Sequence, residues 1–121
     1  MYKKDWLVDQ IEGVINLVAK VFLHKEDASY QVSDTNLSDE DLLYITLKNL
    51  VEKREINEAE NLLFNEVTTL NEKNLAIAIN FYSKLNQLND ETLQEANYSR
   101  QEITQGLHDI MQIFGIQLEL S

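Results

Sequence analysis

Residues 42–70 read LLYITLKNLVEKREINEAENLLFNEVTTL, and this stretch decides the fold. In both halves, apolar residues recur every three or four positions, as they do along one face of an amphipathic helix. The recurring residues are Leu43, Leu47, Leu50 and Val51, followed by Ile56, Ala59, Leu63, Val67 and Leu70. The polar residues 52–55 between the halves make a connection that is too short to separate two helices. The pattern therefore predicts two antiparallel helices whose apolar stripes face each other.

The second half of this stretch resembles a known repeat. Residues 53–67 (KREINEAENLLFNEV) are similar to the turn and second helix of a tetratricopeptide repeat, with Ala59 and Leu63 at the small and large apolar positions that pack on the first helix. The chain departs from that repeat at Leu47, where a small residue is usual, and no second copy follows one repeat-length later. The resemblance implies one degenerate tetratricopeptide-like hairpin and no peptide-binding array.

Three segments carry a second resemblance. They are YKKDWLVDQIE (residues 2–12), INEAENLLF (residues 56–64) and YSRQEITQGLHDIMQIFGI (residues 98–116). With these segments the chain resembles a family of uncharacterised small acidic helical proteins from low-GC Gram-positive bacteria. The resemblance spans nearly the whole chain. It implies a single domain, residues 1–121, in a bacterial cytoplasm, and it brings no activity with it.

The composition is typical of one helical domain. The chain has 121 residues, no proline and three glycines. This length suits one domain with one core, and the composition offers little turn or sheet chemistry. We expect an all-α fold, a five- or six-helix bundle of antiparallel helical hairpins. Because the chain has no cysteine, it has no disulfide or thiolate site. The lack of an export signal favours a cytoplasmic protein.

The net charge of −11 argues against one class of partner. Residues 1–25 contain four Lys and three acidic residues, so the acidic excess lies in the rest of the chain. An acidic body repels phosphate backbones, and no basic stripe with interleaved aromatic residues offsets it. We therefore expect no nucleic-acid partner, and solubility explains the acidic surface.

Residues 1–24 contain the first expected helix. Its apolar residues cover more than one face, which leaves three interpretations open: a central core helix, a helix that pairs with a second copy, or a helix on a membrane surface. Asp5, Asp9, Glu12 and Asn16 interrupt the apolar run and argue against a signal peptide and a transmembrane span. A membrane-surface helix needs a basic polar face, whereas the polar face here is mostly Asp9, Glu12 and Asn16. Gly13 costs about 1 kcal/mol relative to Ala in a helix interior, which favours close packing of a neighbouring helix there.

The rest of the chain divides at turn and capping residues. Residues 25–37 have no helical periodicity and are expected to form a loop. Residues 38–115 form the helical-hairpin body, and residues 116–121 form a tail. The expected caps are Ser38 with Asp41, Asn71, Asn89, and Ser99 with Glu102, and Gly115 is expected to end the last helix.

No residue pattern indicates catalysis or metal binding. The two histidines, His24 and His108, are far apart in the sequence and do not have the paired spacing of a helical metal site. The chain has no glycine-rich phosphate loop and no nucleophile motif. We therefore identify no catalytic, cofactor-binding or metal-binding residue, and we expect no cofactor.

Aromatic and apolar residues give the better indication of function, because Trp and Tyr are enriched at protein interfaces. The candidate interface residues are Trp6, Ile11, Val14, Val18, Val21, Phe22, Tyr44 and Phe64. We predict a non-catalytic protein–protein interaction module of unknown partner, which forms a homodimer through its first helix. Two alternatives stay open: a small enzyme or ligand-binding protein with a pocket between helices, and a membrane-peripheral protein that uses its first helix.

Overall fold

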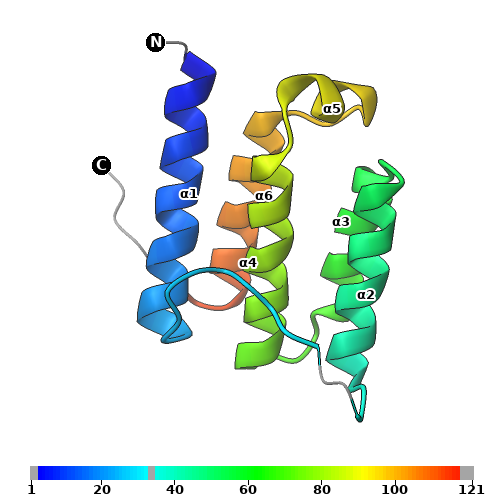
Figure 1. The fold of residues 1–121 in the computed structure, drawn as a ribbon. Helices are drawn as coiled ribbons and strands as arrows, with labels where there is room; N and C mark the ends of the chain where they lie inside the picture. The colour runs from blue at the N-terminus through cyan, green and yellow to red at the C-terminus, as the bar shows by residue number, and fades with distance from the viewer. Residues whose placement is uncertain (1–2, 33–34, 118–121) are drawn as a thin grey trace.

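The computed structural model describes residues 3–32 and 35–117, and its regular secondary structure there is entirely helical (Figure 1). The helices are α1 (Lys3–Phe22), α2 (Asp39–Glu52), α3 (Ile56–Glu66), α4 (Glu72–Gln87), α5 (Asp90–Glu95) and α6 (Arg100–Ile113). The expected all-α bundle of five or six helices is therefore confirmed over the described residues. Residues 33–34 of the expected loop and residues 118–121 of the expected tail lie outside them.

Polar side chains cap the helices where the sequence predicts them. The caps are Ser38 for α2, Asn71 for α4, Asn89 for α5 and Ser99 for α6. At α2, the Ser38 hydroxyl accepts a hydrogen bond from the Asp41 amide (3.1 Å), and the Asp41 carboxylate accepts one from the Ser38 amide (3.2 Å). The same reciprocal pair begins α6. These bonds satisfy amides that have no partner inside the helix.

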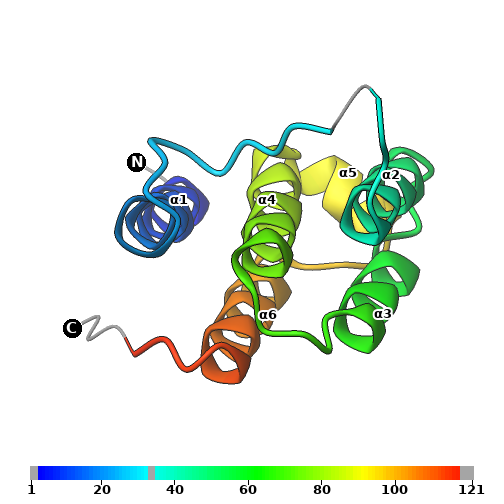
Figure 2. The same cartoon turned by 90° about the horizontal axis from the view of Figure 1, so that it is seen from below.

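The helices pack in three layers, which Figure 2 shows nearly end-on. α4 and α6 form the middle layer, α1 lies on one side of it, and α2 and α3 lie side by side on the other. α4 packs against α1, α2 and α6. Its residues 74–82 are all buried. Over more than two turns, α4 therefore has no face in contact with solvent, which distinguishes it from an ordinary amphipathic helix.

The helix at the centre of the core is thus α4. One interpretation of the sequence made the first helix the central core helix. The structure contradicts it, because α1 is an outer helix with one side exposed to solvent. Asn74, Asn80 and Asn86 are all buried in α4. These polar residues lower the hydropathy of the segment, and so the sequence pattern concealed how completely it is buried.

Each buried asparagine of α4 donates a hydrogen bond to a different part of the chain. Asn74 Nδ2 bonds a carbonyl in the connection between α3 and α4 (2.7 Å). Asn80 Nδ2 bonds the Ala28 carbonyl in the connection between α1 and α2 (2.8 Å), and Asn86 Nδ2 bonds the Val8 carbonyl within α1 (3.0 Å). Buried polar groups need such partners. The three bonds therefore fix the position of α4 relative to the segments around it.

The connection between α1 and α2 is held against the body by side chains. Ala28 is buried, and the Tyr30 hydroxyl donates a hydrogen bond to Asp41 Oδ1 (2.7 Å). The rings of Tyr30 and Tyr44 lie 4.8 Å apart, centroid to centroid. The hydrogen bonds from the Tyr30 hydroxyl and the Ser38 amide hold the pKa of Asp41 below its usual value. The same carboxylate thus caps α2 and fastens the connection that precedes it.

Replacing Asn80 by Ala removes the donor to the Ala28 carbonyl and leaves that buried acceptor without its partner. We expect the free energy of unfolding to fall by about 1–3 kcal/mol. Urea denaturation monitored by circular dichroism measures the change. Asn49→Ala, at an exposed position of α2, is the matched control and should leave the stability nearly unchanged. Equal effects of the two substitutions would contradict a special role for the buried asparagine.

Candidate functional site

The structure divides the predicted interface residues into three groups. Trp6 and Val21 are exposed, at 60% and 51% of their surface. Ile11, Val14 and Val18 are buried. The others, Phe22, Tyr44 and Phe64, are partly buried against the core.

The buried group belongs to the core of a single chain. Ile11, Val14 and Val18 lie on the side of α1 that packs on α4 and α6. In this structure they are not available to a partner, so the stripe that the sequence offered as an interface is used within the chain. On α1, the exposed large apolar residue that the prediction missed is Leu17, which keeps 39% of its surface exposed to solvent.

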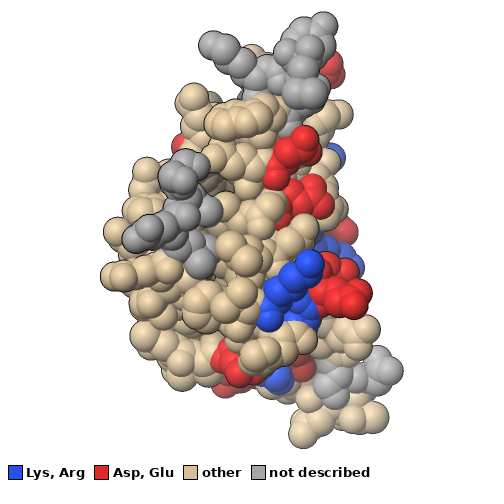
Figure 3. Space-filling view, turned by 90° about the vertical axis from the view of Figure 1, so that its left-hand side faces the viewer, with Lys and Arg blue, Asp and Glu red and all other residues tan. Residues whose placement is uncertain are grey.

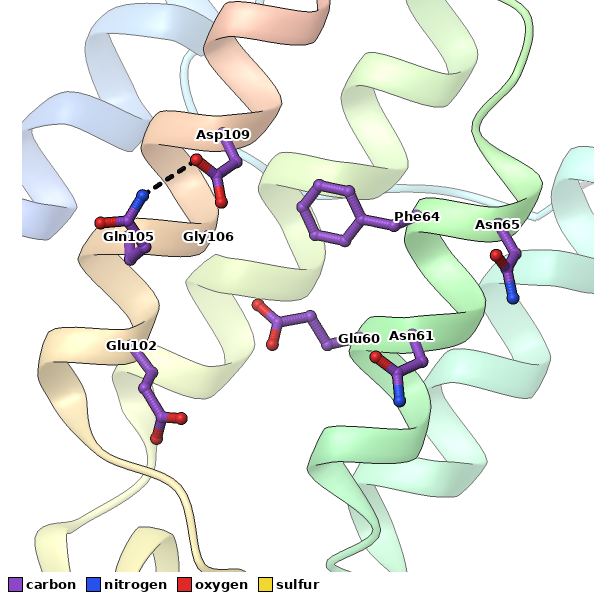
Figure 4. Close-up of a pocket in the computed structure, with 8 residues that line it drawn as sticks. All are labelled: Glu60, Asn61, Phe64, Asn65, Glu102, Gln105, Gly106 and Asp109. Carbon is purple, nitrogen blue, oxygen red and sulfur yellow. Dashed lines mark hydrogen bonds between the residues drawn. The ribbon is translucent and has the colours of Figure 1, made fainter.

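Tyr44 and Phe64 have different surroundings. The ring of Tyr44 contacts Tyr30, and Lys84 Nζ lies 5.6 Å from its centroid. This geometry is that of a cation–π contact within the chain. Phe64 projects from α3 toward α6 in a cleft between these helices (Figure 4). The two aromatic residues therefore do not form one surface with the exposed residues of α1.

The cleft between α3 and α6 has a volume of about 590 Å³. The residues that line it are Glu60, Asn61, Phe64 and Asn65 from α3, and Glu102, Gln105, Gly106 and Asp109 from α6. Three of them are acidic and none is basic. Figure 4 shows Glu60 and Phe64 pointing from α3 toward α6.

Glu60 accepts two hydrogen bonds from buried tyrosines. Its Oε2 lies 2.5 Å from the Tyr82 hydroxyl and 2.9 Å from the Tyr98 hydroxyl. Burial raises the pKa of both tyrosines, and the charge and hydrogen bonding of Glu60 raise it further. The two hydroxyls stay protonated and donate to the carboxylate. They therefore link α3, α4 and the segment before α6 in one cluster.

Gly106 makes room for this cluster on α6. A Cβ atom at this position would overlap the Tyr82 hydroxyl and come within 2.5 Å of Glu60 Oε2. The sequence analysis missed this close approach, although a glycine in the middle of α6 is a signal that could have indicated it. No periodicity indicated the cluster itself, because Glu60 and the two tyrosines are far apart in the chain.

The other two carboxylates of the cleft are also hydrogen-bonded within the chain. The Ser99 amide donates to Glu102 Oε2 (2.6 Å), which is part of the cap of α6. Gln105 Nε2 donates to Asp109 Oδ1 (2.9 Å), as the dashed line in Figure 4 marks. Each of the three acids in the cleft therefore has a structural partner, and the cleft holds no nucleophile paired with a base.

A second candidate surface lies on the solvent side of α1. Trp6, Gln10, Gly13, Leu17 and Val21 follow one another at steps of three or four residues, which places them on one side of the helix. We call these five residues the α1 outer face. All five are exposed. In Figure 3, which looks at the molecule from this side, charged residues gather in a column along one edge, and the neighbouring surface is largely uncharged.

A small cavity of about 140 Å³ adjoins the α1 outer face. It lies between α1 and α6 and is lined by Gln10, Ile11, Val14, Thr104, Leu107, His108 and Met111. Most of its wall is apolar, and Gln10 belongs to both the cavity and the outer face. The uncharged surface therefore continues from α1 toward α6.

Neither histidine lies in a group of potential metal ligands among the described residues. Over residues 3–32 and 35–117, no group of three or more His, Asp or Glu side chains is arranged to hold a metal ion. His24 and His108 are both exposed. In the same part of the chain, no helix has the length and apolar character that a membrane crossing requires.

Gly106→Ala tests the close approach of α6 to the Tyr82 cluster. The added methyl group has no room, so we expect a loss of about 1–3 kcal/mol in the free energy of unfolding. Gly13→Ala is the matched control, because a Cβ there meets nothing within 4 Å. It should stabilise the monomer by up to about 1 kcal/mol through helix propensity. Thermal unfolding at low protein concentration distinguishes the two, and stabilisation by both would refute the steric argument.

The tyrosine cluster also predicts how stability depends on pH. In the unfolded chain tyrosines lose their protons near pH 10. Because the pKa of Tyr82 and Tyr98 is raised in the folded chain, the folded chain binds more protons above that pH. Stability is then complete below about pH 9 and falls as the pH rises above about 10.

Urea denaturation between neutral and alkaline pH measures this slope. Tyr82→Phe should lower the overall stability, because it removes a donor to Glu60. It should also make the alkaline slope shallower, by about one proton per tyrosine removed. Tyr98→Phe should act in the same way. An unchanged slope in both variants would show that these hydroxyls do not titrate as their burial requires.

Comparison with known proteins identifies the family of the chain but indicates no activity. Neither the curated proteins nor the solved structures include a significant match to this chain. A family model described as a family of unknown function, DUF6483, matches residues 1–115. The match covers nearly the whole chain, as the resemblance to an uncharacterised family implied, and the chain belongs to this family, DUF6483.

Proposed function

We propose that this chain is a non-catalytic protein–protein interaction module, and that it self-associates through the α1 outer face. The observation that carries the proposal is the exposure of three large apolar side chains on one side of one helix. The exposed fractions of Trp6, Leu17 and Val21 are 60%, 39% and 51% of their surface. Burying apolar surface gains about 25 cal/mol per Å². Association with a partner that covers this face removes these side chains from water and is therefore favourable.

The arrangement of these residues supports an interface more than their number does. Single exposed apolar residues are common on proteins, but a continuous patch marks a binding surface. The α1 outer face runs along the helix, continues into the apolar wall of the neighbouring cavity and has charged residues along one edge. A centre depleted of charged residues beside a polar rim is the usual composition of a protein interface.

We also propose how α2 and α3 are arranged. In it, α2 and α3 form an antiparallel, degenerate tetratricopeptide-like hairpin within a single domain, residues 1–121. The burial of Ala59 and Leu63, both fully inaccessible to solvent, supports this arrangement. In this proposal the hairpin is a structural part of the helical body and not a peptide-binding groove. We propose that the protein is bacterial and cytoplasmic, because the chain resembles small acidic helical proteins from low-GC Gram-positive bacteria.

Two alternatives have less support. A ligand-binding protein would use the cleft between α3 and α6, but its three carboxylates already accept hydrogen bonds within the chain. A membrane-peripheral protein would need a basic face beside the apolar one. The edge of the α1 outer face carries Asp9 and Lys20, which do not make a basic face.

Leu17→Glu and Val21→Glu test the proposed surface. Each puts a charge into the apolar contact, so we expect sedimentation velocity to show a monomer where the wild-type chain shows a dimer. Both positions are exposed in the monomer, so circular dichroism should show an unchanged helical content.

Leu42→Glu is the matched control. Leu42 has a similar exposure, 49%, but lies on α2. This variant should associate like the wild type. A wild-type chain that remains monomeric at every accessible concentration would contradict self-association, and an equal effect of Leu42→Glu would place the contact elsewhere.

A further inference from the structure

Gly13 lies at the middle of α1, with ten helical residues before it and nine after it. It belongs to the α1 outer face, and a Cβ at this position would meet nothing within 4 Å. The chain itself therefore does not need a glycine there, although glycine weakens a helix interior by about 1 kcal/mol relative to Ala. A position without a side chain allows the backbone of a second helix to approach closely.

The edge of the α1 outer face carries one charge of each sign, in different halves of the helix. On this edge, Asp9 precedes Gly13 and Lys20 follows it. At 100° per residue, Asp9 and Lys20 lie on the same edge of the face. A second α1 helix in parallel orientation would bring like charges together. In antiparallel orientation, Asp9 of each helix lies near Lys20 of the other, and these opposite charges attract.

The charge of the whole chain also bears on the occupant of this face. A net charge of −11 makes two copies repel each other over most of their surfaces. The α1 outer face is a surface where this repulsion is weak, because its five residues carry no charge and its edge carries both signs. It therefore suits contact between two copies better than the acidic surfaces do.

From these observations we infer that the α1 outer face binds the same face of a second copy of this chain, with the two α1 helices antiparallel and crossing at Gly13. This inference rests on the proposed function and specifies its partner and geometry. A two-fold axis through the crossing point relates the copies, and such isologous contacts are the commonest in homodimers.

The register follows from the crossing point. With Gly13 opposite Gly13, Trp6 lies seven residues from the crossing on one helix and Lys20 lies seven residues from it on the other. The Trp6 ring then receives the Lys20 ammonium of the second copy, as in a cation–π contact. Asp9 lies about one turn from the same ammonium. Gln10 comes opposite Leu17 of the second copy, within about 2 Å along the axis.

Disulfide formation between copies tests this register, because the chain has no cysteine of its own. Two single variants, Gln10→Cys and Leu17→Cys, are purified separately and oxidised either alone or as a mixture. The antiparallel register predicts a cross-linked dimer in the mixture. It predicts little or none from either variant alone, since two copies of residue 10 are offset by about 9 Å and two of residue 17 by about 12 Å. A disulfide needs Cα atoms within about 7 Å.

The opposite pattern would overturn the inference. Cross-linking of each variant alone, with none specific to the mixture, would indicate a parallel pair. No cross-linking in a chain that still dimerises, and whose dimer is lost in Leu17→Glu, would reject this register and leave the proposed function standing. A wild-type chain that is monomeric throughout would reject both.

Gly13→Gln provides an independent measurement. Gln has a high helix propensity, and its side chain has open space in the monomer. The monomer should therefore stay folded and become no less stable. Its side chain obstructs the crossing point, so the dissociation constant from sedimentation equilibrium should rise by about tenfold or more. An unchanged dissociation constant would show that the helices do not cross at Gly13.

Discussion

The burial of α4 on every side over residues 74–82 is the constraint on which the other helices depend. A helix buried on every side must satisfy its polar side chains inside the protein, because water is not available to them. Asn80 and Asn86 meet this condition by bonding carbonyls of Ala28 and Val8, so the connection after α1 and α1 itself are positioned by polar contacts as well as by apolar packing. Arg100, at the start of α6, donates in turn to the Asn86 carbonyl (2.8 Å). The central helix thus orients segments from both ends of the chain.

The cluster of Glu60, Tyr82 and Tyr98 extends this constraint to α3. Its two hydroxyls and one carboxylate are hydrogen-bonded beneath a cleft whose acids would otherwise suggest a cation site. Because the fold already uses all three acids, the cleft is better explained as a consequence of how α3 and α6 meet. Gly106 permits that meeting at one point. The cleft beside it is the space that the remaining, longer side chains leave between the two helices.

α1 has two apolar sides, and one of them faces solvent. One side packs on α4 and α6 and includes Ile11, Val14 and Val18, and the other forms the α1 outer face. A helix of a monomer needs only the first of these. The α1 outer face leaves Trp6 exposed to solvent, and no other part of the described chain covers it. This imbalance is the reason that the functional argument rests on α1 and not on the cleft, although the cleft is the larger concave feature.

The sequence by itself determined the local elements: the caps at Ser38, Asn71, Asn89 and Ser99, the turn after α2, the helical class and the acidic surface. These depend on residues within a few positions of each other, and their physical rules act locally. It also identified Trp6 and Val21 as candidate interface residues, together with the buried residues Ile11, Val14 and Val18. It could not separate the exposed residues from the buried ones, because a helix that is apolar on two sides does not reveal which side its neighbours cover. Only the tertiary structure decided that α4 is the central helix, that Glu60 lies against two tyrosines, and that Leu17 remains exposed. Those outcomes depend on contacts between residues far apart in the chain, which no periodicity encodes.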